Sequence, residues 1–208
     1  MTCVRTDWLP VSAAALITGA TALFLGAQMT PRPRGDGDLL RTASEHGDRF
    51  AILAVLFTLA SVGLLVGVPS LFTLFQRRGF RTGLVAAVLL SVGALMLAAF
   101  AQVLIVFRSL AQHDAVTEQA IDAIASDALL QAMMGSAFVA FYLGELLLAL
   151  ALFRARTTPP WVPWMFTAHV VSVPFTQALP EGWTGAGTLL MAAGFAGCAM
   201  AANRQGRI

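Results

Sequence analysis

The sequence contains no lysine, and its 208 residues are only 12% charged. An ordinary soluble domain is about 25% charged. Hydrophobic residues make up 58% of the chain, and its mean hydropathy is +0.77. So few charges in so apolar a chain exclude a soluble domain and predict an integral membrane protein. Almost the whole length lies in apolar runs, so we expect residues 1–208 to form one membrane domain.

Residue types that build common cofactor and metal sites are also scarce. Cys3 and Cys198 are too few and too far apart to indicate a disulfide framework or a zinc site. The chain has no GxxxxGK[ST] phosphate loop, GxSxG elbow or HExxH pair. A haem held by two membrane histidines is excluded because only His169 falls inside an apolar run. The EHGD tetrapeptide at 45–48 is more typical of a solvated helix cap than of a metal site. We therefore expect no metal and no cofactor.

Long hydrophobic runs are what the sequence does have. Crossing a bilayer takes about 20 residues, and six runs reach that length: 8–29, 50–75, 83–107, 128–153, 161–179 and 184–203. Their continuity excludes the alternating pattern of a barrel strand. The first run resembles a signal peptide, but no small-residue cleavage site follows it. The predicted fold is all-α, a polytopic membrane bundle of six transmembrane helices, with bends at Pro69 and Pro174.

Arginine placement predicts the orientation of the bundle. With a cytoplasmic N-terminus, the inner segments hold eight arginines and one acid, and the outer loops hold five arginines and nine acids. The positive-inside rule therefore predicts a multi-pass protein of the cell membrane with both termini in the cytoplasm. In the outer loop 109–127, Val116, Ala120 and Ile124 are four residues apart, with Asp114 at a possible helix start. This spacing favours a short amphipathic helix, and an ordinary solvated connector is the alternative.

Glu145, within FVAFYLGELLLALALF (138–153), is the only acid well inside a predicted span. A charged carboxylate at the bilayer centre costs about 3 kcal/mol, so such residues usually face the bundle interior and mark functional sites. We expect Glu145 to be largely neutral unless it is paired. Around the axis of its own predicted helix, four side chains lie within about 40° of Glu145 and one lies about 60° away. The four are Gln131, Met134, Phe138 and Phe141, and the fifth is Tyr142. For the phenylalanines alone, helix packing is the plainer interpretation.

His169 is predicted to lie level with Glu145. Each is about eight residues from the inner end of its span, which is a depth of about 12 Å. We therefore predict a hydrogen bond between the two, with Phe166 on the same face as the histidine. Gln102 and Gln177 lie near outer helix ends, so they predict a cavity with a polar outer side. Hydrogen bonding between helices is the alternative role for these amides.

Two resemblances bear on function. The RRGFR turn at 77–81, the arginines at 154 and 156, and the proline and tryptophan before the fifth span resemble those of small five- to six-span membrane proteins of actinobacteria. That resemblance covers most of the chain and implies no activity. In size and chemistry the chain is also similar to small membrane-bound terpene cyclases, which use intramembrane acids to protonate an alkene or epoxide. No motif is matched, the fungal enzymes have seven helices, and no site residue is carried over.

The residues themselves indicate one chemistry and leave two alternatives open. A neutral acid in a dry pocket can protonate an isoprenoid, and aromatic faces stabilise the resulting carbocation. We expect Glu145 to be the general acid, His169 to orient it or restore its proton, and Tyr142 with the phenylalanines to shape a lipophilic, prenylated substrate. The alternatives are a small transporter with a Glu145/His169 proton relay, and a structural or immunity protein in which Glu145 fixes helix register. No basic, aromatic-interleaved patch points to nucleic acid.

Overall fold

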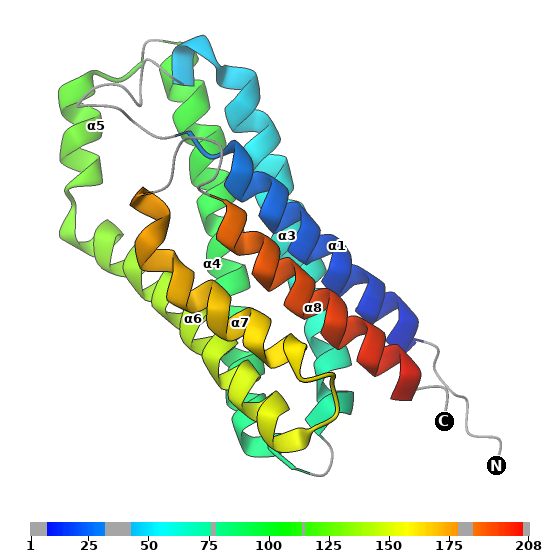
Figure 1. The fold of residues 1–208 in the computed structure, drawn as a ribbon. Coiled ribbons are helices and arrows are strands. Elements are labelled where there is room, and N and C mark those ends of the chain that lie inside the picture. The colour runs from blue at the N-terminus through cyan, green and yellow to red at the C-terminus, as the bar shows by residue number, and fades with distance from the viewer. Residues whose placement is uncertain (1–7, 32–42, 76–77, 114, 179–184, 206–208) are drawn as a thin grey trace, which may run out of the picture.

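Every regular element among the described residues of the computed structural model is a helix (Figure 1). The described residues are 8–31, 43–75, 78–113, 115–178 and 185–205. The elements are α1 (Trp8–Met29), α3 (Gly47–Leu71) with the 3-10 turn η1 (Phe72–Phe75), α4 (Phe80–Gln112), α5 (Glu118–Ala125), α6 (Ala128–Ala155), α7 (Trp161–Ser172) with the 3-10 turn η2 (Val173–Ala178), and α8 (Ala186–Gln205). The predicted all-α class is confirmed.

Five described helices are long and apolar enough to cross a membrane: α1, α3 with η1, α4, α6 and α8. Their bounds lie within a few residues of the predicted runs. The predicted span 161–179 is the exception, because α7 has 12 residues and continues as the six-residue η2. Pro174 accounts for this change, since it lacks the N–H that an α-helix interior requires. Helix length therefore supports five spans rather than the six predicted.

The long helices form a ring in chain order. Each packs against the next one along the chain, except that the short α7 lies between α6 and α8, and α8 returns to pack against α1 (Figure 1). Short connections make such neighbours antiparallel. The short α5 stands outside the ring, beside the start of α6, and confirms the helix predicted in the loop 109–127. It begins at Glu118, and the predicted start at Asp114 lies outside the described residues.

Small residues hold α1 and α3 close together. A Cβ on Gly19 would lie 2.6 Å from the backbone nitrogen of Leu64, and a Cβ on Gly63 would lie 2.6 Å from Cα of Gly19. The Ser12 hydroxyl donates to the Val66 carbonyl oxygen at 2.7 Å. Small residues and interhelical hydrogen bonds of this kind are what draw helices together in lipid. The α1–α3 pair therefore forms one fixed side of the ring.

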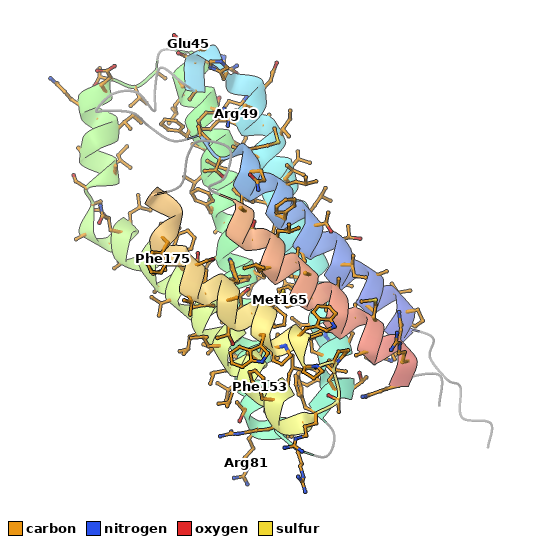
Figure 2. All side chains as sticks on the ribbon, viewed as in Figure 1. Glu45, Arg49, Arg81, Phe153, Met165 and Phe175 are labelled. Carbon is orange, nitrogen blue, oxygen red and sulfur yellow. The ribbon has the colours of Figure 1, made fainter. Side chains whose placement is uncertain are left out.

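The two ends of the ring differ in charge. Arg81, Arg154 and Arg204 lie at the end where α4 begins and α6 and α8 finish, hereafter the arginine-rich end. Glu45 and Arg49 lie at the opposite end, hereafter the α5 end (Figure 2). Among the described residues, every acid except Glu145 belongs to the α5 end or the α5 segment.

Arginines at the α5 end also bind backbone. Arg49 Nε donates to the carbonyl oxygen of Met29, the last residue of α1, at 2.7 Å. Arg108 Nε donates to the Gly47 carbonyl oxygen at 2.8 Å, and so joins α4 to the start of α3. The Arg49 contact satisfies a carbonyl group at the C-terminus of α1, which the helix itself leaves free. These contacts hold α1, α3 and α4 together at the α5 end of the ring.

Candidate functional site

Glu145 of α6 and His169 of α7 form a buried hydrogen-bonded pair. Oε2 of Glu145 lies 2.7 Å from Nδ1 of His169, and the two residues are 0% and 3% exposed. The predicted contact is confirmed, because the short connection between α6 and α7 leaves both residues at the same depth. Oε1 of Glu145 is buried and has no hydrogen-bond partner in the described part of the chain. His169 is therefore the one side chain that satisfies this carboxyl group among the described residues.

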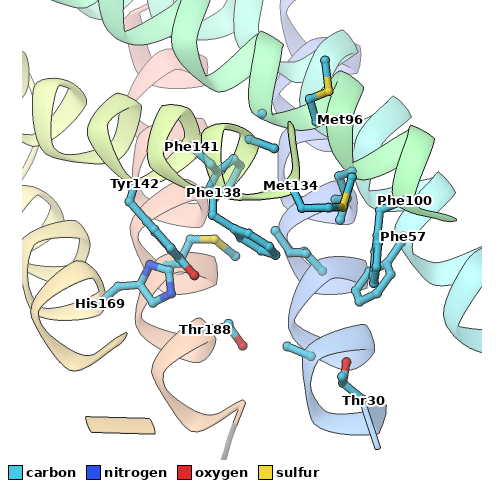
Figure 3. A pocket seen from close by; sticks show the side chains of 16 residues that line it. Thr30, Phe57, Met96, Phe100, Met134, Phe138, Phe141, Tyr142, His169 and Thr188 are labelled. Atoms are coloured by element: carbon cyan, nitrogen blue, oxygen red, sulfur yellow. The ribbon is translucent and has the colours of Figure 1, made fainter. Parts of the chain in front are cut away.

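A cavity of about 380 Å³ lies inside the ring, in the half toward the α5 end (Figure 3). All the ring helices supply walls to it, among them Leu23 of α1, Phe57 of α3, Phe100 of α4, Phe138 of α6 and Met191 of α8. The volume falls within the range of about 300–1,000 Å³ that small-molecule sites occupy. The predominantly apolar walls fit a lipophilic ligand.

Four polar side chains border this cavity: Thr30, Tyr142, His169 and Thr188. Each threonine hydroxyl donates to a carbonyl oxygen of its own segment, at 3.0 Å for Thr30 and 2.6 Å for Thr188. The Tyr142 hydroxyl and Nε2 of His169 make no hydrogen bond within the described residues. The Tyr142 ring stands edge-on to the His169 ring, with centroids 5.9 Å apart. A ligand would therefore meet its free polar partners at one place, beside these two rings.

His169 borders the cavity, and Glu145 does not. Because Nδ1 is held by Glu145, Nε2 is the ring nitrogen left to face a ligand. The imidazole thus stands between the carboxyl group and the cavity. Glu145 can act on a ligand only through His169, whereas the sequence had indicated direct contact by Glu145.

The predicted aromatic face of α6 lies on the cavity. Met134, Phe138 and Phe141 border it together with Tyr142. The Phe138 and Tyr142 rings are stacked, with centroids 6.3 Å apart and an angle of 19° between their planes. The helical spacing that placed these residues near Glu145 therefore did identify one continuous lining surface.

Two predicted lining residues lie elsewhere for local reasons. Gln131 is exposed, and its Nε2 donates to the Ala125 carbonyl oxygen at the α5–α6 junction, at 2.9 Å. Phe166 is 0% exposed and packs edge-on against Phe195 of α8, with centroids 4.9 Å apart. It precedes His169 by three residues, which turns it about 60° around the helix. That rotation directs Phe166 to α8 and leaves His169 beside α6.

The predicted polar outer side made of glutamines is corrected as well. Gln102 is exposed and does not border the cavity. It follows the cavity residue Phe100 by two positions, which places it about 200° away on the same helix. The Gln177 side chain lies outside the described residues. Thr30 and Thr188, which the sequence did not single out, occupy that side of the cavity.

In comparisons with known proteins, no family model, curated protein or solved structure matches the chain. Among the described residues, no group of three or more metal-ligating side chains occurs. Fold alone does not specify activity. The buried pair and the cavity beside it are therefore the features on which a function can be based.

Proposed function

We propose that the protein is a multi-pass membrane enzyme that moves a proton on a lipophilic, prenylated substrate and so starts its cyclisation. His169 contacts the substrate from the cavity wall, and Glu145 supplies or accepts the proton behind it. One observation carries the proposal: Nδ1 of His169 lies 2.7 Å from a sealed carboxyl group, while the same imidazole borders an apolar cavity. A base or acid oriented by a second buried group is the usual arrangement for proton transfer.

The acid strength of this pair favours one kind of substrate. An imidazolium is too weak an acid to protonate an unactivated alkene readily, but it can donate to the oxygen of an epoxide. The proton then goes to oxygen, the C–O bond breaks, and the π electrons of a nearby double bond form a new C–C bond. Loss of a proton from the final cation restores the pair, so the product is an isomer of the substrate. The rings of Phe138, Phe141 and Tyr142 would stabilise the cation by cation–π attraction.

The packing supports catalysis over a proton relay across the membrane. A relay needs a path for water on both sides of the pair. On the arginine-rich side of Glu145, the next turns of α6 place Leu148 and Leu152, which are 0% and 1% exposed. The cavity lies on the other side of the pair, beside His169. These two buried leucines offer no polar group that could carry a proton toward the arginine-rich end, which favours catalysis over a relay.

The α7–η2 segment fits a sixth crossing, although it is not a single long helix. Its 12 α-helical and six 3-10 residues extend about 30 Å at about 1.5 and 2.0 Å per residue. That length equals the hydrocarbon thickness of a bilayer, about 30 Å. With six crossings and the arginine-rich end in the cytoplasm, both termini are cytoplasmic.

The test uses 10,11-epoxyfarnesol, a prenyl chain with a terminal epoxide, incubated with the full chain in proteoliposomes. We expect cyclic isomers of unchanged mass, detected by gas chromatography with mass spectrometry. A reaction in deuterium oxide shows which atom receives the proton in the first step. Transfer to the epoxide oxygen places no deuterium on carbon, whereas transfer to an alkene carbon places one deuterium atom there. The Glu145→Gln variant keeps a hydrogen-bonding group and removes the acid, so turnover should fall at least about 100-fold, as for loss of a general acid.

Gln131→Ala is the matched control, because this exposed residue lies on the same helix and does not border the cavity. It should keep full turnover. Full turnover by the Glu145→Gln variant would show that Glu145 does not supply the proton. A Glu145→Gln variant with a lower melting temperature and unchanged turnover would indicate a purely structural role. Proton flux into the proteoliposomes that depends on Glu145 and needs no substrate would indicate a relay.

A further inference from the structure

The two halves of α6 differ in how they pack. None of residues 128–141, all of them described, is buried. The second half contains all the buried residues of the helix: Gly144, Glu145, Leu148, Ala149, Ala151 and Leu152. A Cβ added to Gly135 would meet nothing within 4 Å. The first half of α6 therefore has one side on the cavity and is only partly covered by neighbouring helices.

Phe138 lies both in the cavity wall and on the exposed half of α6. Its side chain borders the cavity, and 55% of the residue is exposed. The next residue, Val139, is 64% exposed and does not border the cavity. A single aromatic ring, stacked on Tyr142, thus separates the cavity from the bilayer at this point. An aromatic side chain on an exposed helix can change rotamer within nanoseconds.

The polar groups of the cavity that lack a hydrogen-bond partner among the described residues lie at one end. The Tyr142 hydroxyl and His169 Nε2 are its free polar groups within the described residues, as Figure 3 shows at one side of the space. The opposite wall carries Phe57 and Phe100, whose ring centroids are 5.9 Å apart. A ligand that satisfies this surface has one polar group and a hydrocarbon body. The volume of about 380 Å³ admits one such chain and is too small for a two-chain phospholipid.

We propose that a single-chain lipophile with one terminal oxygen group enters this cavity sideways from the bilayer, past Phe138. Its oxygen group lies at Tyr142 and His169, and its chain extends toward Phe57 and Phe100. The lipid phase is the source because Phe138 lies in the cavity wall on the half of α6 that contains no buried residue. The proposal rests on the proposed function for its ligand class, but it concerns binding and access, which need no turnover.

The test uses a farnesol analogue with a diazirine on its chain, incorporated in proteoliposomes and activated by light. Peptide mass spectrometry should locate the label on the cavity face, at Met134, Phe138 or Phe100. Unlabelled farnesol should compete for the site, whereas farnesane, the same skeleton without the hydroxyl, should compete at least about tenfold less well. Ala137→Phe fills the cavity and should lower labelling at least tenfold. Val139→Phe, on the lipid side, should change labelling by less than twofold.

The route is tested by the rate of labelling after farnesol analogue is added to the membrane. Phe138→Ala should increase this rate severalfold, and Phe138→Trp should decrease it. Equal rates in both variants, or label confined to the Thr30 and Thr188 side, would overturn the lateral route. The lateral route would also be overturned if a second copy of the chain covered this half of α6. In a Cys3→Ala background, that arrangement would appear as a disulfide-linked dimer of the Met133→Cys variant, and the dimer would no longer be labelled. If labelling follows these expectations but the unmodified protein does not isomerise the epoxide, the lateral route stands and the proposed function fails.

Discussion

Oε2 of Glu145 lies 2.7 Å from Nδ1 of His169 across the α6–α7 contact, and of the two residues only His169 borders the cavity. Among the described residues, each side chain is therefore the other's only hydrogen-bond partner. This mutual dependence has consequences for stability as well as for chemistry, because losing one partner leaves the other buried and unsatisfied.

The first prediction concerns the stability of this pair. Glu145→Leu and His169→Leu should each lower the free energy of unfolding by about 1–2 kcal/mol, the range for hydrogen bonds between membrane helices. The double variant should be more stable than either single variant, because it leaves no unpaired polar group. Equilibrium unfolding in mixed micelles measures all four proteins. Strictly additive losses would show that the two residues are not coupled.

The second prediction concerns the α1–α3 contact. Gly63→Val should lower the free energy of unfolding by about 3 kcal/mol, because added carbon atoms would overlap the α1 backbone, which cannot move aside. Gly135→Ala is the control, since a Cβ there meets nothing within 4 Å. It should be neutral or stabilising by up to about 1 kcal/mol from helix propensity. Thermal unfolding monitored by circular dichroism distinguishes the two, and similar losses in both would contradict the close approach.

The third prediction concerns two left-handed positions at the arginine-rich end. Gly79 has φ of 80° and Arg156, the C-cap of α6, has φ of 54°. Gly79→Ala should destabilise by about 1–2 kcal/mol, the cost of a side chain in this conformation. A Cβ there would also lie 2.9 Å from the Ala151 carbonyl oxygen. Arg156→Gly should have the opposite sign, because glycine removes that strain. Destabilisation by Arg156→Gly would indicate that its charge matters more than its backbone.

The sequence indicated five of its six predicted spans and the Glu145–His169 pair, because each depends on one-dimensional information. Apolar runs have a length, and two residues at equal distance from a short connection must lie level. The cavity wall was not predictable beyond α6, because a helix that is apolar all round does not reveal which face meets its neighbours. Phe57 and Thr188 could therefore not be placed beside His169. The change to 3-10 geometry at Pro174 was predicted only as a bend.

The fourth prediction concerns orientation. In a Cys3→Ala background, Ser126→Cys at the exposed α5–α6 junction should react with a membrane-impermeant maleimide added outside intact cells. Arg78→Cys, exposed beside the start of α4, should react only after the cells are opened. The remaining Cys198 is 0% exposed and provides no background label. The reverse pattern would place the arginine-rich end outside and contradict cytoplasmic termini.

The central claim is that His169 transfers the proton and Glu145 acts through it. The most direct measurement is turnover of 10,11-epoxyfarnesol by His169→Ala and Glu145→Gln in proteoliposomes, each with and without added imidazole. We predict that both variants lose turnover and that imidazole, which fits the space left by the missing ring, restores His169→Ala at least about tenfold and leaves Glu145→Gln unchanged. Full turnover by His169→Ala without imidazole would contradict the claim.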